Sequence, residues 1–150
     1  MSVDDNKALA MRFFDALDTG NIPILEIIFT EDCLFHRGDL IEPAHGLAGI
    51  TSIVDKRVQL YRDFRTTIHQ IIGEGDLVAT RETHEGIHRG QFTTPIGTFD
   101  VTGRPIEWTS QVLFRCRTGK IAEMWVARDE LGILRSLEII LEARQSAVFT

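Results

Sequence analysis

The chain has 150 residues, of which 43% are hydrophobic and 25% charged, and its formal net charge is −6. This length suits one domain with its own hydrophobic core, and the composition is ordinary for a soluble globular protein. The acidic balance argues against nucleic acid or an anionic membrane as the partner, because both attract basic surfaces.

No apolar run is long enough to span a bilayer, and the first residues lack the basic and apolar regions of a signal peptide. Cys33 and Cys116 lie far apart and neither belongs to a CxxC pair. We therefore expect two buried free thiols in a reducing cytoplasm.

Helical periodicity dominates the first part of the chain. Apolar residues recur at helical spacing from Leu9 to Leu17, with Asp4 and Asp5 as expected caps and Gly20 just after the helix. Pro23 favours a short second helix over residues 24–29. A short strand over 33–37, a loop over 38–46 and a third helix over 47–61 are expected next.

After Phe64 the apolar pattern alternates with period two. This predicts strands over residues 66–72, 77–88, 105–115 and 121–128, with turns at 73–76 and 117–120. Residues 89–103 are expected to form a loop. Asp129 is expected to cap a last helix over 130–144, and the tail 145–150 is either disordered or docked on a partner. The order predicts one α+β domain over residues 1–150, with an antiparallel sheet curled around three N-terminal helices and a pocket between the two layers.

The segment from Leu77 to Phe92 places ionisable side chains in an apolar context. In a strand, Glu82, His84 and His88 share one face. Glu82 and His84 would then lie about 6–7 Å apart along the strand, close enough to contact one small molecule. Imidazole, with an ordinary pKa of about 6.5, exchanges protons near neutrality, and a neighbouring carboxylate would fix its tautomer and favour its charged form. Alternation alone leaves open whether this face lines a pocket or meets solvent.

The spacing of His84 and His88 would suit a metal ion on a helix. On a strand it corresponds to about 13 Å, too far for one ion that needs its nitrogens at about 2 Å. No metal site is therefore predicted, and His88 is interpreted as a polar group at the pocket rim or as a hairpin residue.

Arg37 ends the first expected strand on the same face as Phe35. An inward arginine would anchor an anion or a carbonyl group, and a surface salt bridge is the alternative. Parity places Trp125 on the opposite, dimer-facing side of the sheet. The residues expected to form the substrate-binding wall of the pocket are Phe14, Phe35, Trp108, Val112, Met124 and Val126.

Residues 119–137, GKIAEMWVARDELGILRSL, resemble the closing signature of SnoaL-like polyketide cyclases. Nearly the whole chain is similar to this family in the order of AMRFFDALDTGN, FTEDCLFH, GEGDLV, THEGIHRGQF and TGRPIEW. The resemblance implies the cone-shaped fold of the nuclear transport factor 2-like superfamily, a homodimer, and no metal or organic cofactor. The superfamily includes cyclases, ketosteroid isomerases, limonene-type epoxide hydrolases, dehydratases and binding proteins, so the fold does not choose the chemistry.

The catalytic positions of these relatives carry other residues here. The carboxylate and histidine of SnoaL-type cyclases align with Val126 and Val112. The epoxide-hydrolase arginine and aspartate align with Glu82 and His84, and the ketosteroid isomerase base falls near Arg37. If the protein is a catalyst, its acid–base residues are expected on the strand at 77–88 rather than on the last two strands.

The first hypothesis is a cofactor-free enzyme that cyclises, isomerises or dehydrates a hydrophobic polyketide-like or polycyclic molecule. His84 would be the general base or acid, Glu82 would orient it, and Arg37 would anchor an enolate or carboxylate. A limonene-type epoxide hydrolase, in which Glu82 activates water, is one alternative. The other is a binding protein that uses the same pocket without catalysis. Three or more polar groups converging inside the pocket would favour an enzyme.

Overall fold

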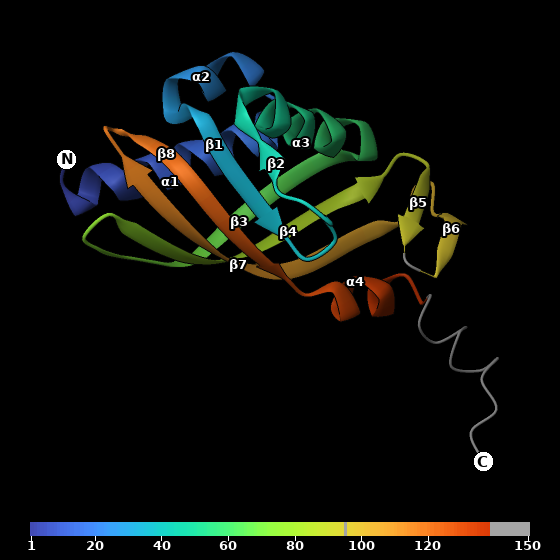
Figure 1. Cartoon of the computed structure of the whole chain (residues 1–150). Helices are drawn as coiled ribbons and strands as arrows, with labels where there is room; N and C mark the ends of the chain where they lie inside the picture. The colour runs from blue at the N-terminus through green and yellow to red at the C-terminus, as the bar shows by residue number, and fades with distance from the viewer. Residues whose placement is uncertain (95, 139–150) are drawn as a thin grey trace.

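The protein, described by a computed structural model over residues 1–94 and 96–138, is an α+β cone (Figure 1). The helical layer consists of α1 (Val3–Thr19), the turn η1 (Ile22–Ile24), α2 (Leu25–Ile28) and α3 (Gly46–Leu60). The large sheet consists of β1 (Phe29–Arg37), β2 (Ala44–His45), β3 (Tyr61–Glu74), β4 (Leu77–His88), β7 (Pro105–Arg117) and β8 (Lys120–Arg128). A final helix, α4 (Glu130–Ser136), lies at the end of the molecule away from the N-terminus.

The strand order in the large sheet is β2-β1-β8-β7-β4-β3. Every neighbouring pair is antiparallel except β1 and β8, which run parallel, so the sheet is mixed and the expectation of a purely antiparallel sheet is wrong at this pair. The pairs joined by short turns must be antiparallel. No such turn links β1 to β8, which are far apart in the chain. Their relative direction therefore depends on the tertiary arrangement of the elements between them.

The helix ends follow local capping chemistry. Ser2, rather than Asp4 or Asp5, caps α1: its hydroxyl accepts from the Asp5 N–H and the Asp5 carboxylate accepts from the Ser2 N–H. Gly20 ends the helix in the left-handed conformation. Asp129 caps α4 as expected, by accepting from the Gly132 N–H. α4 ends at Ser136, and the part of the expected helix from residue 139, like the tail, lies outside the described residues.

The segment expected to be a loop at 89–103 contains a small hairpin. Its strands are β5 (Gln91–Thr94) and β6 (Gly97–Asp100), which pair in register with Phe92 opposite Phe99. The prediction was wrong because glycine and proline dominate the segment, while the cross-strand aromatic pair that favours a hairpin is visible only once the register is known. The hairpin extends from the same end of the molecule as α4 (Figure 1).

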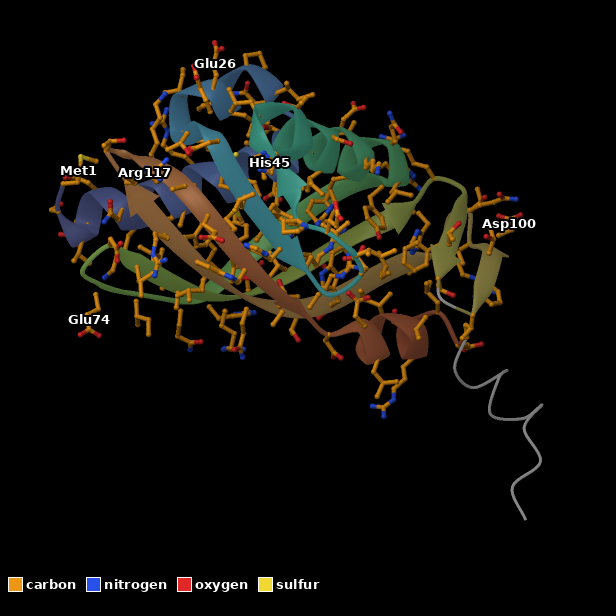
Figure 2. All side chains as sticks on the ribbon, in the orientation of Figure 1. Met1, Glu26, His45, Glu74, Asp100 and Arg117 are labelled. Atoms are coloured by element: carbon orange, nitrogen blue, oxygen red, sulfur yellow. The ribbon has the colours of Figure 1, made fainter. Side chains whose placement is uncertain are left out.

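Two apolar clusters fill the cone, and side chains occupy the space between helices and sheet (Figure 2). The larger cluster joins α1 and α3 to the middle of the sheet and includes both cysteines as free thiols, as expected. The smaller lies at the end near α4, around Tyr61, Trp108 and Ile133. None of the described helices is long and apolar enough to cross a membrane.

Candidate functional site

The inward face of β4 is the face that the sequence singled out. Val78, Thr80, Glu82, His84 and His88 are buried there, while the alternate side chains are partly or fully exposed. The cone interior contains a narrow cavity of about 20 Å³, room for about one water molecule. The predicted site residues that line it are Phe14, Phe35, Arg37, His84, Trp108, Val112, Met124 and Val126.

A wider cavity of about 670 Å³ opens at the end of the cone near α4. Its wall is built from the end of α3, strand β5, and the segments that follow β1 and β8. This size suits a drug-sized molecule. The two cavities share a boundary formed by Arg37, Ile53, Arg57 and Arg128.

Glu82 and His84 belong to one buried hydrogen-bond network. The Glu82 carboxyl group bonds the Thr80 hydroxyl over 2.8 Å and the Ser110 hydroxyl over 2.7 Å. Ser110 also lies 3.2 Å from His84 Nε2. The closest approach between Glu82 Oε2 and His84 Nε2 is 3.9 Å, so Ser110 bridges the two groups.

The network continues from the other side of the imidazole. His84 Nδ1 lies 2.9 Å from Thr66 Oγ1 on β3. The Thr66 hydroxyl donates to Asp18 Oδ1 over 2.7 Å, and the Thr66 backbone N–H donates to Oδ2 over 2.9 Å. A chain of hydrogen bonds, which we call the relay, therefore runs Asp18–Thr66–His84–Ser110–Glu82.

Counting protons shows what charge state the relay needs. Its four links each need one proton. Two hydroxyls and a neutral imidazole supply one each, which makes three. The relay is therefore complete only with one more proton, on Glu82, on Asp18, or on His84 as imidazolium. The extra proton can move from Glu82 to His84 if the Ser110 hydroxyl accepts a proton from Glu82 and donates its own proton to His84 Nε2.

Burial decides where this proton resides. Burial, followed by the charges of Arg57 and Arg128, lowers the pKa of His84 to about 3. Burial also raises the pKa of Glu82, although its hydrogen bonds to Ser110 and Thr80 oppose the shift. The pKa of the half-buried Asp18 is raised by burial as well. Glu82 is 0% exposed, and among the described residues its one possible cationic partner is the disfavoured imidazolium, so burial favours the protonated form of Glu82. The expectation that Glu82 favours a charged imidazole is wrong, because desolvation outweighs the attraction.

The His84 ring is enclosed by aromatic side chains. The ring centroids of Phe14, Phe64 and Trp108 lie 5.9, 5.6 and 5.3 Å from the imidazole centroid. Only 3% of His84 is exposed. A group that reacts with His84 must therefore reach it through the narrow cavity.

The boundary between the cavities carries three arginines, of which two pair with acidic side chains among the described residues. Arg37 forms a two-point ion pair with Asp39, and Arg128 forms one with Glu130. Arg57, on α3, lies instead over the rings of Phe64 and Trp108, with its guanidinium carbon 4.7 and 5.2 Å from their centroids. Arg37 thus faces inward, as expected, but its charge is already neutralised.

Sequence reasoning missed four residues of this site. Arg57 left a signal, because it is a cation within the apolar stripe of α3. Ser110 left a weaker one, because it shares the inward parity of Trp108 and Val112 on β7. Thr66 and Asp18 left none, because their positions next to His84 depend on the β3–β4 register and on the docking of α1.

The remaining polar predictions are placed as follows. His88 is not at the pocket rim: it is 1% exposed and packs against Tyr61 and Phe92, with neither ring nitrogen hydrogen-bonded. Glu82 lies behind the cavity wall and lines neither cavity. His36 faces the convex side, where it stacks on Trp125 and bonds Glu123 over 2.6 Å. Within residues 1–94 and 96–138, no three His, Cys, Asp or Glu side chains are grouped as metal ligands.

The chain belongs to the SnoaL-like polyketide cyclase family, because the model of that family matches residues 8–137. Among solved structures, TsrD from Streptomyces laurentii is similar with a TM-score of 0.80 at 19% identity, over 93% of this chain and 98% of TsrD. IdmH from Streptomyces antibioticus, provisionally described as a polyketide cyclase, has a TM-score of 0.74 at 26% identity, over 88% and 97% of the two chains.

AclR from Streptomyces galilaeus, provisionally described as a hydroxylase, has a TM-score of 0.76 at 21% identity, over 91% of this chain and 97% of AclR. Comparison with curated proteins found no match. The described activities of these neighbours differ, so the reaction of this chain has to be argued from its own residues.

Proposed function

We propose that the protein is a cofactor-independent acid–base enzyme that cyclises, isomerises or dehydrates a hydrophobic polyketide-like or polycyclic molecule. The observation that carries the proposal is the relay, a continuous chain of hydrogen bonds in a nearly dry site, in which His84 and Ser110 line the narrow cavity that adjoins the one of about 670 Å³. Each of these reactions needs a proton removed at one atom of the substrate and supplied at another.

The relay supports both directions of proton movement. A substrate oxygen that reaches Ser110 or His84 receives a proton, and Glu82 replaces it through Ser110. A proton taken from the substrate returns to Glu82 by the same path. In this proposal His84 is the general acid or base and Glu82 is the proton store. The substrate occupies the wider cavity and extends one group past Ile53 and Arg57 towards His84.

The test is the exchange of hydrogen for deuterium at carbon next to a carbonyl, followed by NMR in D₂O. The probes are ring-fused aryl ketones and aryl β-keto esters, because this exchange reports proton abstraction whatever reaction follows. We expect His84→Gln to slow the catalysed exchange by roughly 10²–10⁴-fold. A loss of less than about threefold in a folded variant would exclude the role of His84.

A matched control is available on the other face of the sheet. His69 is exposed on β3 and bonds the Thr83 hydroxyl over 2.7 Å, much as His84 bonds Thr66. His69→Gln should leave the exchange rate unchanged. An equal loss in both variants would mean that the effect is not specific to the relay.

A non-catalytic binding protein is the second candidate. Two observations favour it: both ring nitrogens of His84 are already hydrogen-bonded, and the cavity beside it has a volume of only about 20 Å³. Wild-type protein that binds the probes but does not accelerate their exchange would establish this function instead. The epoxide-hydrolase alternative gains no support, because both oxygens of Glu82 are hydrogen-bonded and neither cavity reaches it.

The convex face of the sheet supports a homodimer. Ile72, Ala79, Leu113 and Trp125 are cross-strand neighbours in one row across β3, β4, β7 and β8. Ile72 is 66% exposed and Leu113 37%. An apolar row of this kind favours a second copy as its cover. Light scattering after size-exclusion chromatography tests this, with Leu113→Glu expected to shift the protein towards monomer.

A further inference from the structure

Arg57 is a buried cation without a counter-ion. Only 9% of the residue is exposed, and its Nη1 atom has no hydrogen-bond partner. In the described part of the chain no acidic side chain forms an ion pair with it. A buried guanidinium in this state is costly unless something else supplies the acceptor.

The charge of Arg57 is compensated only in part, because Asp18 attracts it through space without forming an ion pair with it. The neighbouring Arg37 and Arg128 are each paired, with Asp39 and Glu130. Lys56 adds a further positive charge to the wall of the wider cavity. Because Arg37 and Arg128 are paired, the boundary between the cavities carries the positive charge of Arg57, in a chain whose formal net charge is −6.

A second unpaired donor lies beside Arg57. The indole Nε1 of Trp108 is buried with no partner, and the Trp108 ring centroid lies 5.2 Å from the Arg57 guanidinium carbon. Both residues line the narrow cavity, and Arg57 lines the wider one too. Buried donors without acceptors are rare in native structures, so two residues with such donors on the wall of one cavity favour a ligand that accepts hydrogen bonds there.

We propose that Arg57, assisted by Trp108, binds the carboxylate of an apolar aromatic acid whose ring system occupies the wider cavity. The proposal rests on the proposed function, in which this cavity holds the substrate. A carboxylate fits because its two oxygens match the fork of guanidinium donors. A phosphate would bring more charge than one uncompensated arginine neutralises, and a neutral carbonyl would leave the guanidinium charge uncompensated.

Carboxylate binding would also activate the relay. The charged groups near His84 are Arg57 on α3, Arg128 on β8, Asp18 through Thr66, and Glu82 through Ser110. The arginines add to burial in lowering the pKa of His84. A carboxylate on Arg57 cancels one of these charges, so the pKa of His84 rises and the imidazole becomes a better base when the site is occupied.

The test compares 2-naphthoate with 2-naphthamide by isothermal titration calorimetry on the full chain. Wild-type protein should bind the acid at least about tenfold more tightly than the amide, since a hydrogen bond to a charged group is worth that much. Arg57→Met should abolish this preference while keeping the affinity for the amide within about twofold. Arg57→Lys should keep part of it, because the charge stays while the fork is lost.

Arg12→Met is the matched control, because Arg12 is exposed on α1 and lines neither cavity. It should leave both affinities unchanged. Equal affinities for acid and amide in wild-type protein, or a preference retained by Arg57→Met, would overturn the proposal. Circular dichroism verifies that each variant is folded, and Arg57→Lys serves as the test if Arg57→Met does not fold.

The outcome separates this inference from the proposed function. Selective naphthoate binding without hydrogen exchange at either the neutral ketones or an aryl keto acid, which brings its own carboxylate to Arg57, would support the carboxylate site and reject catalysis. Exchange at those ketones with no preference for the acid would reject the carboxylate site alone. A direct readout is the NMR titration of His84, whose pKa should rise in the presence of naphthoate and stay low with naphthamide.

Discussion

The two faces of the β3–β4 pair carry the same chemical groups in opposite environments. On the concave face His84 bonds the Thr66 hydroxyl, and on the convex face His69 bonds the Thr83 hydroxyl. Glu82 points inward with 0% exposure, and Glu85 points outward to an ion pair with Arg65. Inside, burial favours neutral His84 and protonated Glu82, while the Asp18 carboxyl group accepts two hydrogen bonds from Thr66. Outside, water screens the charges of Glu85 and Arg65. The comparison shows that residue types alone do not identify a functional site, because their burial differs between the two faces.

Replacing the glutamate on each face should give the largest difference. Glu82→Gln keeps a group that donates to Ser110, as protonated glutamic acid does, but it does not release a proton. We expect the exchange rate to fall by roughly 10²-fold, whereas Glu85→Gln should leave it unchanged. Chemical denaturation should show Glu82→Gln within about 1 kcal/mol of wild type. A much larger loss of stability would mean that Glu82 is ionised in the folded protein.

Replacing the threonine on each face tests the hydrogen bonds themselves. Thr66→Val leaves His84 Nδ1 and the Asp18 carboxylate without their shared partner, which should cost about 1–3 kcal/mol of unfolding free energy. Thr83→Val removes an exposed hydroxyl that water replaces, so it should change stability by less than about 0.5 kcal/mol. Urea denaturation measures both values. Equal costs would contradict the difference between the faces.

The pH dependence of stability tests the state of His84. The folded protein favours neutral imidazole, with a pKa of about 3, while the unfolded chain binds a proton below about pH 6.5. The contribution of neutral His84 to the free energy of unfolding is therefore complete above about pH 6.5 and is lost as the pH falls towards 3. Relative to His84→Gln, wild type should lose about 2 kcal/mol between pH 7.5 and 5.

The smallest effect is expected at the convex ion pair. Arg65 and Glu85 are 70% and 37% exposed, so breaking the pair with Arg65→Gln should cost less than about 1 kcal/mol. The cost should shrink further in 0.5 M salt because screening weakens exposed charges. A large and salt-independent loss would place this face in a dry environment, such as a subunit interface.

Much of the fold was predictable because the bounds of its longer helices and strands follow from local residue patterns. Strand β4 has the predicted bounds, and α3 starts and ends within one residue of the predicted helix. Failures occurred where short elements depend on distant partners. The β5–β6 hairpin depends on the register that sets Phe92 opposite Phe99, and the parallel direction of β1 depends on its pairing with β8.

The sequence by itself determined the α+β cone, the family and the placement of Glu82 and His84 on one face of a strand. Residue periodicity is a local property, and the order of the motifs along the chain can be recognised without the fold. Only the tertiary structure decided that this face is the inner one and that Ser110, Thr66 and Asp18 complete a relay. It also decided that Arg57, unlike Arg37, is a buried cation with no ion pair to an acidic side chain in the described part of the chain. Protonation and pairing depend on burial and on neighbours brought from distant segments, which no local pattern specifies.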